Sequence, residues 1–168
     1  MSQHVIHPIP PLFDAHSQIL ILGSFPSVRS RETAFFYGHP QNRFWPLIAK
    51  MTRCDVPQTV EDKKQLILRH HLALWDVIAS CDIEGSSDCS IKNVIPNDLS
   101  VILRHAPIRL IAVNGKTAQK YYLKFILPDF GQNPILLPST SPANATWSFE
   151  RLLETWTALL GFQSESAY

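Results

Sequence analysis

Four short hydrophobic segments along this chain alternate with stretches that have a helical pattern. The segments lie at residues 18–23, 72–77, 109–113 and 134–138. Each is a continuous apolar run, which is typical of a strand that is buried on both faces of a sheet. A proline-rich segment at residues 8–12 precedes the first of them and predicts an extended lead-in.

Helices are predicted between and after these segments. Apolar residues recur at helical spacing after the first strand, namely Phe44, Leu47, Ile48 and Met51. Helical patterns also cover residues 60–70, 116–126 and 152–160, and the last ends at Gly161. Strands that alternate with helices pair in parallel through right-handed crossovers. The pattern therefore predicts an α/β fold, a three-layer α/β/α sandwich around a mostly parallel four-stranded sheet.

The length of 168 residues, of which 45% are hydrophobic, is typical of one domain, and we expect its core at about residues 18–160. The net charge is +1, so a polyanionic partner needs a local basic patch. Residues 1–53 carry five basic and two acidic groups, and residues 99–124 carry five basic and no acidic groups. These two segments would supply such a patch if they met in space.

Cysteine and histidine spacing argues against two classes of site. Cys54, Cys81 and Cys89 are odd in number and have no CxxC spacing, and the seven histidines form no HExxH motif. We therefore expect no disulfide framework, no metal and no cofactor. The longest apolar runs are far shorter than the roughly 20 residues of a membrane span. No signal peptide is evident, and we expect a cytoplasmic monomer without a membrane segment.

Chemistry is expected after the strands, because ligands of open α/β sheets bind beyond the carboxyl ends of the strands. The first strand leads into Gly-Ser-Phe-Pro-Ser at residues 23–27, and an aromatic run follows at residues 35–45. Phe44 fits the helical pattern and is expected in the core. Tyr37 precedes Gly38 in a loop, where an aromatic ring can stack on a flat base.

These motifs make the chain recognisable. Gly-Ser-Phe-Pro-Ser at 23–27, His-Pro-Gln-Asn-Arg-Phe-Trp at 39–45 and Pro-Ser-Thr-Ser-Pro-Ala-Asn at 138–144 resemble the uracil-DNA glycosylase superfamily. The resemblance is closest to its hypoxanthine DNA glycosylase branch, with local similarity to mismatch-specific uracil glycosylases. It implies an enzyme that flips a deaminated base out of DNA and hydrolyses its N-glycosidic bond. No lysine stands in a motif, so we expect a monofunctional enzyme.

The first motif departs from the common pattern of the superfamily. Phe25 stands where most members have Asp or Asn, and Ser24 where another branch has Glu. Leu137 replaces the usual histidine of the second motif. These changes favour hypoxanthine over uracil as the base that is excised faster. The resemblance points to Asn42 as the catalytic residue, whose amide can hold a water. The alternative is that Asn42 only caps the helix that begins near Phe44.

The resemblance also implies binding residues. We expect contacts with the base from Gly23, Ser24, Phe25 and Tyr37. Asp76 and Asn114 are expected to read the edge of the base because each lies at the end of a strand. Contacts with DNA are expected from Ser27, Arg43, Ser139, Thr140, Ser141, Pro142, Ala143 and Asn144. The second motif precedes a helix, and a helix start favours a phosphate. For each of these residues a purely structural role, such as a helix cap or a turn, is the alternative.

Other classes of protein fit the sequence less well. A serine hydrolase with Ser24 or Ser27 as nucleophile needs a partnered histidine, but no GxSxG motif is present and no histidine follows His105. A mismatch-specific uracil glycosylase is the alternative within the superfamily. A nucleic-acid-binding module that has lost catalysis is the alternative outside enzymes, since Phe25 and Leu137 remove two usual functional groups.

Overall fold

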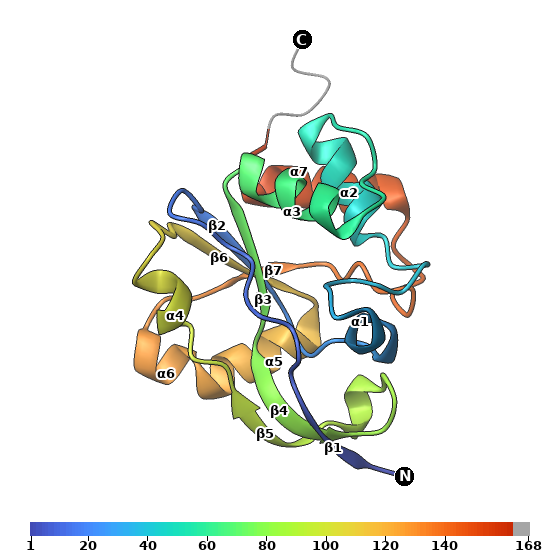
Figure 1. The fold of residues 1–168 in the computed structure, drawn as a ribbon, viewed down its shortest axis with the longest axis vertical. Helices are drawn as coiled ribbons and strands as arrows, with labels where there is room; N and C mark the ends of the chain where they lie inside the picture. Colours follow the sequence, from blue (N-terminus) through green and yellow to red (C-terminus); the bar gives the residue numbers. More distant parts are fainter. Residues whose placement is uncertain (163–168) are drawn as a thin grey trace.

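The four predicted strands form one parallel sheet in the order β3–β2–β6–β7 (Figure 1). They are β2 (Ile19–Gly23), β3 (Leu72–Asp76), β6 (Leu110–Asn114) and β7 (Ile135–Leu137). Every residue of β2 and β3 is buried, which explains why their sequences are apolar up to Asp76 at the end of β3. The computed structural model describes residues 1–162. The prediction of a parallel four-stranded sheet is confirmed.

Helices cover both faces of this sheet (Figure 1). One face carries α2 (Phe44–Thr52), α3 (Val60–Arg69) and α7 (Phe149–Leu160), and the other carries α5 (Lys116–Phe125) and α6 (Leu127–Phe130). Thr59 and Ser148 accept the N-terminal amides of α3 and α7, and Gly161 ends α7 in a left-handed conformation. The predicted three-layer arrangement is confirmed. No helix within residues 1–162 is long and apolar enough to cross a membrane.

A second, antiparallel sheet was not predicted. It consists of β1 (Gln3–Ile6), β4 (Ile78–Ile83) and β5 (Lys92–Pro96), in the order β1–β4–β5. β1 and β5 are short, and most of their residues are only partly buried or exposed, so they lack the apolar runs that revealed the other strands. β4 follows β3 after Val77 alone, and the short helix η1 (Asp88–Ser90) lies between β4 and β5. This sheet brings the N-terminal segment next to the end of β3.

Two short helices complete the described chain. α1 (Val28–Thr33) follows β2, and α4 (Ser100–Leu103) precedes β6. Ser27 caps the start of α1, and its hydroxyl accepts the amide of Ser30 at 3.2 Å. Trp156 of α7 is fully buried, and its indole donates to the carbonyl of Pro138 at 2.9 Å. The last helix therefore fixes the start of the second motif against the core.

Candidate active site

The carboxyl ends of three parallel strands place Gly23, Asp76 and Asn114 at one edge of the sheet. Gly23 is in register with Asp76, and Leu22 is in register with Val113, the neighbour of Asn114. A Cβ atom added at Gly23 would lie 2.4 Å from Oδ1 of Asp76 and 3.3 Å from the hydroxyl of Tyr37. The four residues therefore surround one space, as the position of the motifs predicted.

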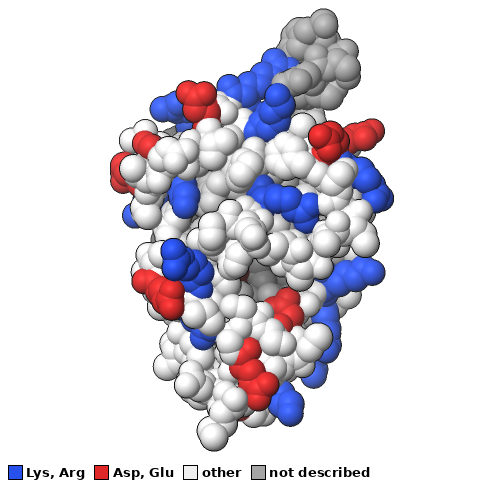
Figure 2. Space-filling model, turned by 90° about the vertical axis from the view of Figure 1, so that its right-hand side faces the viewer, with Lys and Arg blue, Asp and Glu red and all other residues white. Residues whose placement is uncertain are grey.

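The molecular surface is hollowed on the side where α1 lies (Figure 2). Lys and Arg side chains lie above this hollow and Asp and Glu side chains lie below it, and the basic groups are scattered over the face. Among the described residues, no continuous positive patch is seen on this face. Attraction of a polyanion would depend on individual basic groups around the hollow.

Tyr37 is held rigidly at this edge. Its backbone is left-handed, with φ of 52°, and its ring stacks on Phe44 with centroids 4.0 Å apart. Its hydroxyl accepts a hydrogen bond from the amide of Asn114 at 3.3 Å. Burial raises the pKa of Tyr37, the charge of Asp76 adds to this, and the bond from Asn114 opposes it. One face of the ring is therefore taken by Phe44, and a flipped base can stack only on the other.

Asn114 connects the first motif to the second. Its Nδ2 also donates to Oγ1 of Thr140 at 3.0 Å, and its Oδ1 accepts the amide of Thr140 at 3.1 Å. Thr140 is fully buried, so its hydroxyl serves this internal contact and does not face solvent. Both protons of the Asn114 amide are used, so only the remaining lone pair of its Oδ1 could bind a base.

Asn42 lies just before Arg43, the N-cap of α2, and bonds to the first residue of that helix. Its Oδ1 accepts the amide of Phe44 at 2.9 Å, and the residue is partly exposed. A carbonyl oxygen has two lone pairs, so this bond leaves one lone pair and both amide protons for other partners. A structural role of Asn42 at the start of α2 and a catalytic role are therefore compatible, because the bond from Phe44 fixes the side chain and leaves its other polar positions free.

Arg43 joins the segment at residues 39–45 to the second motif by an internal contact that the sequence did not reveal. Its guanidinium donates to the carbonyls of Ser141 and Asn144 at 3.1 and 3.0 Å, and also to that of Trp147. Its backbone amide donates to the carbonyl of Thr140 at 3.1 Å. Arg43 thus holds the loop that contains the second motif, and its contact with DNA stays a prediction.

The loop of the second motif is bonded largely to itself. The amide of Ser141 bonds to Oγ of Ser139 at 3.1 Å, and Nδ2 of Asn144 bonds to the carbonyl of Ser139 at 3.0 Å. Pro142 and Ala143 are exposed at its tip. The expected helix start at this motif is wrong, since α7 begins only at Phe149. The residues between the motif and α7 form turns, so the N-terminus of α7 lies outside this motif.

Two residues near the site, His7 and Asp88, could not be predicted from the sequence. Nε2 of His7 lies 2.7 Å from Oδ2 of Asp76. The pKa of Asp88 in η1 is raised, mainly by burial of its carboxyl. The side chains of Thr117 and Ser24 oppose this shift, and the charge of Asp76 adds to it. Neither residue stands in a motif, and both depend on the antiparallel sheet that was not predicted.

The side chain of Phe25 is buried inside the protein. The centroids of the Phe25 and His7 rings lie 5.9 Å apart in an edge-to-face arrangement, and Cζ of Arg31 lies 5.7 Å from the Phe25 centroid. The side chain thus packs behind the turn at Gly23. A contact between this turn and a base would therefore be made by its backbone.

A comparison with known protein families identifies the chain. Residues 10–160 match the model of the uracil DNA glycosylase superfamily. The chain belongs to this superfamily. The resemblance seen in the motifs is confirmed, and with it the prediction of a DNA glycosylase.

Two curated relatives and one solved structure agree with this assignment. A protein named hypoxanthine DNA glycosylase from Methanosarcina acetivorans is 36% identical over 152 residues, which cover 89% of this chain and 94% of the relative. A protein of the same name from Methanosarcina barkeri is 34% identical over 137 residues, covering 80% and 85%. A solution NMR structure of an M. acetivorans protein, provisionally named a uracil DNA glycosylase, has a TM-score of 0.77 and 34% identity, covering 92% and 96%.

Proposed function

We propose that this DNA glycosylase excises hypoxanthine from DNA and leaves an abasic site. The observation that carries the proposal is the carboxylate oxygen of Asp76 over Gly23, beside the hydroxyl of Tyr37. It offers a hydrogen-bond acceptor at the carboxyl end of the sheet, where hypoxanthine would present its N1–H. The names of the two Methanosarcina relatives support the same substrate.

Hydrolysis of the N-glycosidic bond can proceed here without a carboxylate nucleophile. The sugar acquires oxocarbenium character while the base leaves with negative charge, so orienting a water and stabilising the base can supply most of the catalysis. Asn42 would hold the water through the lone pair and protons that its cap leaves free. Backbone amides of Ser24 and Phe25 would face the departing base.

The remaining expected residues would place the base and the DNA. Tyr37 would stack on the flipped base opposite its contact with Phe44. Pro142 and Ala143, at the exposed tip of the second loop, would enter the duplex where the base leaves it. Ser27, Ser139, Ser141 and Asn144 would lie near phosphates, while Arg43 and Thr140 keep the loop in place.

A comparison of substrates tests the function directly. We expect hypoxanthine opposite thymine to be excised at least about tenfold faster than uracil opposite guanine, because two groups suited to uracil are replaced by Phe25 and Leu137, and one such donor is worth roughly 3 kcal/mol. Single-turnover rates on duplexes with hypoxanthine, uracil, xanthine or thymine, scored as abasic sites, measure this. Faster excision of uracil would instead make the chain a mismatch-specific uracil glycosylase, which is the second candidate because the M. acetivorans protein solved by NMR carries a uracil glycosylase name.

Substitution of Tyr37 separates stacking from hydrogen bonding. Base stacking on an aromatic ring is worth about 1–3 kcal/mol, so Tyr37→Ala should slow excision about 5- to 150-fold. Tyr37→Phe keeps the ring and loses only the bond from Asn114, so it should slow excision much less. Single-turnover rates with hypoxanthine-containing duplex provide the measurement. Equal losses in the two variants would assign the effect to the hydroxyl.

A further inference from the structure

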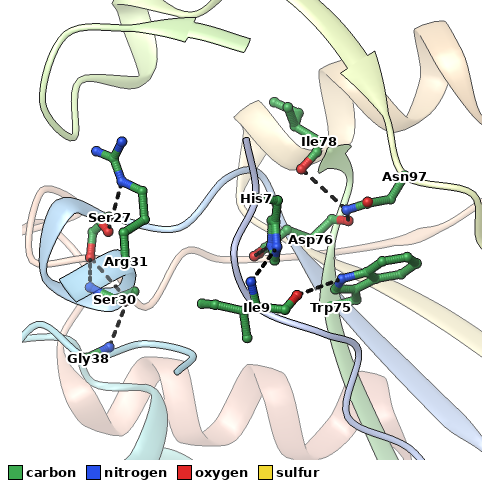
Figure 3. A network of polar contacts seen from close by, with 10 residues as sticks. All are labelled: His7, Ile9, Ser27, Ser30, Arg31, Gly38, Trp75, Asp76, Ile78 and Asn97. Atoms are coloured by element: carbon green, nitrogen blue, oxygen red, sulfur yellow. Dashed lines mark hydrogen bonds and ion pairs between the residues drawn. The ribbon is translucent and has the colours of Figure 1, made fainter. Parts of the chain in front are cut away.

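His7 and Asp76 form a buried pair at the carboxyl end of β3 (Figure 3). Nε2 of His7 lies 2.7 Å from Oδ2 of Asp76, and the two side chains are only 4% and 6% exposed. The rings of Phe25 and Trp75 meet the imidazole edge-on. The amide of His7 donates to the carbonyl of Ala79 at 2.7 Å, which fixes the segment after β1. His7 is therefore a rigid neighbour of the carboxylate.

The backbone determines which nitrogen of His7 carries the proton. The amide of Ile9 donates to Nδ1 of His7 at 3.1 Å (Figure 3), so Nδ1 must present a lone pair. The proton then lies on Nε2, and the neutral ring donates to Oδ2 of Asp76. Oδ2 is thereby fixed as an acceptor, and His7 cannot accept a hydrogen bond from this position without losing its bond to Ile9.

The second oxygen of Asp76 faces accessible space. Among the described residues, none donates a hydrogen bond to Oδ1 of Asp76. Every fully buried side-chain nitrogen or oxygen atom of these residues has a hydrogen-bond partner. Oδ1 is therefore not sealed inside the protein. It lies over Gly23 and near the hydroxyl of Tyr37, at the place where the base is expected.

We propose that His7 is a positioning residue that makes Asp76 present an acceptor to the base, and that this acceptor selects purines with a proton on N1. The inference rests on the proposed excision of hypoxanthine and explains why adenine would not be excised. A 6-oxopurine such as hypoxanthine donates its N1–H to Oδ1. Adenine has a lone pair at N1, which would face the lone pairs of Oδ1 and repel them.

Asp76→Asn gives a test in which His7 decides the outcome. An amide has one acceptor end and one donor end. Because Nε2 of His7 donates, the amide oxygen of the variant should turn toward His7 and its NH2 toward the base. The pocket would then offer a donor where the natural protein offers an acceptor. It would suit a purine with a lone pair at N1, and it would oppose hypoxanthine.

The measurement compares two bases in the same duplex. One is hypoxanthine, and the other is the unsubstituted purine of 2′-deoxynebularine, which has a lone pair at N1. The ratio of their single-turnover rates in Asp76→Asn should fall at least about tenfold below the wild-type ratio, as expected for loss of a charge-assisted hydrogen bond. Division by the wild-type ratio removes the different intrinsic stabilities of the two glycosidic bonds.

A second substitution tests His7 itself. In Asp76→Asn combined with His7→Leu, no donor constrains the amide, which can again turn its oxygen toward the base. The rate ratio should recover several-fold, although the variant has lost a further polar contact. A merely structural His7 would lower both rates together and leave the ratio unchanged. If the double variant with His7→Leu does not fold, His7→Gln is combined with Asp76→Asn instead. The amide oxygen of the glutamine can accept a hydrogen bond from the NH2 group of the asparagine.

The chain provides a matched control in a second histidine–aspartate pair. Nδ1 of His4 lies 3.0 Å from Oδ1 of Asp82 on the same antiparallel sheet, but this pair is exposed. His4→Leu should leave both rates and their ratio within about twofold of wild type, since exposed pairs contribute little.

The outcomes distinguish this inference from the function on which it rests. A wild-type protein that excises uracil but not hypoxanthine would overturn the proposed function and this inference with it. A wild-type protein active on hypoxanthine, with an unchanged ratio in Asp76→Asn, would overturn only recognition by Asp76. A ratio that falls in Asp76→Asn but does not recover when His7 is also replaced would show that His7 does not position the side chain.

Discussion

Asn42→Ala should reduce the single-turnover rate of base excision about 100- to 1000-fold, while the affinity for DNA changes by only a few fold. The magnitude is that of removing one group that acts on the transition state. Neither Phe25 nor Ser24 can take over, because the phenyl ring has no polar group and the hydroxyl of Ser24 already contacts Asp88. Single-turnover kinetics and a DNA-binding titration on the same hypoxanthine duplex measure the two quantities.

The cap that Asn42 provides requires its own control. Loss of a side-chain cap costs about 1 kcal/mol, or a shift in Tm of roughly 2–4 °C for a chain of this size. Thr59→Ala removes another side-chain bond at a helix start, in which Thr59, the N-cap of α3, accepts the amide of Asp62 at 3.0 Å. It should lower Tm similarly and leave excision unchanged. Near-normal rates in Asn42→Ala would leave Asn42 with the cap as its only role.

Asn42→Asp refines this test, because aspartate also caps helices well and keeps an acceptor for water. Stability should stay close to that of the natural protein, and excision should exceed that of Asn42→Ala. If both substitutions abolish excision equally, the amide protons of Asn42 are the required groups. The comparison thus identifies which end of the side chain holds the water.

The strands that are buried on both faces could be predicted, because burial gives them a continuous apolar sequence. β2 and β3 are covered on both faces, so all their positions except Asp76 at the end of β3 are apolar, and the continuous runs identify them. β1 and β5 carry polar and exposed residues, since they form the two edges of a small sheet, and no run marks them. Their place depends on pairing with β4, which is a contact between distant parts of the chain.

The candidate site shows the same division. Gly23, Tyr37 and Asn114 could be found from their position in motifs or at strand ends, and the structure brings them together. His7 could not, because it reaches Asp76 across 69 positions through the pairing of β1 with β4. Arg43 was found, but its three carbonyl partners depend on the conformation of a loop that no pattern specifies.

Gly23→Ala should abolish most excision and also destabilise the protein. The added Cβ would lie 2.4 Å from Oδ1 of Asp76, which is too close for any real contact. Asp76 cannot easily move away, since His7 holds its other oxygen. The backbone of Gly23 is fixed as well, because its carbonyl accepts the amide of Val77 at 2.8 Å. Overpacking of this kind costs about 1–3 kcal/mol of unfolding free energy.

The loss of activity in Gly23→Ala can be separated from the loss of stability. Gly131→Ala adds a Cβ with no atom within 4 Å, but at a left-handed φ of 82°, so it should destabilise the protein by about 1 kcal/mol through backbone strain alone and leave excision intact. The double variant Gly23→Ala with Asp76→Ala removes the carboxylate that the new methyl group meets. Asp76→Ala alone leaves the buried Nε2–H of His7 without its partner and should lower Tm by itself. In the Asp76→Ala background, Gly23→Ala should therefore lower Tm less than it does in the natural protein, while excision of hypoxanthine stays low because the acceptor for N1–H is gone. Normal excision in the double variant would contradict recognition of the base by Asp76, whereas an equal loss of Tm in both backgrounds would place the collision elsewhere.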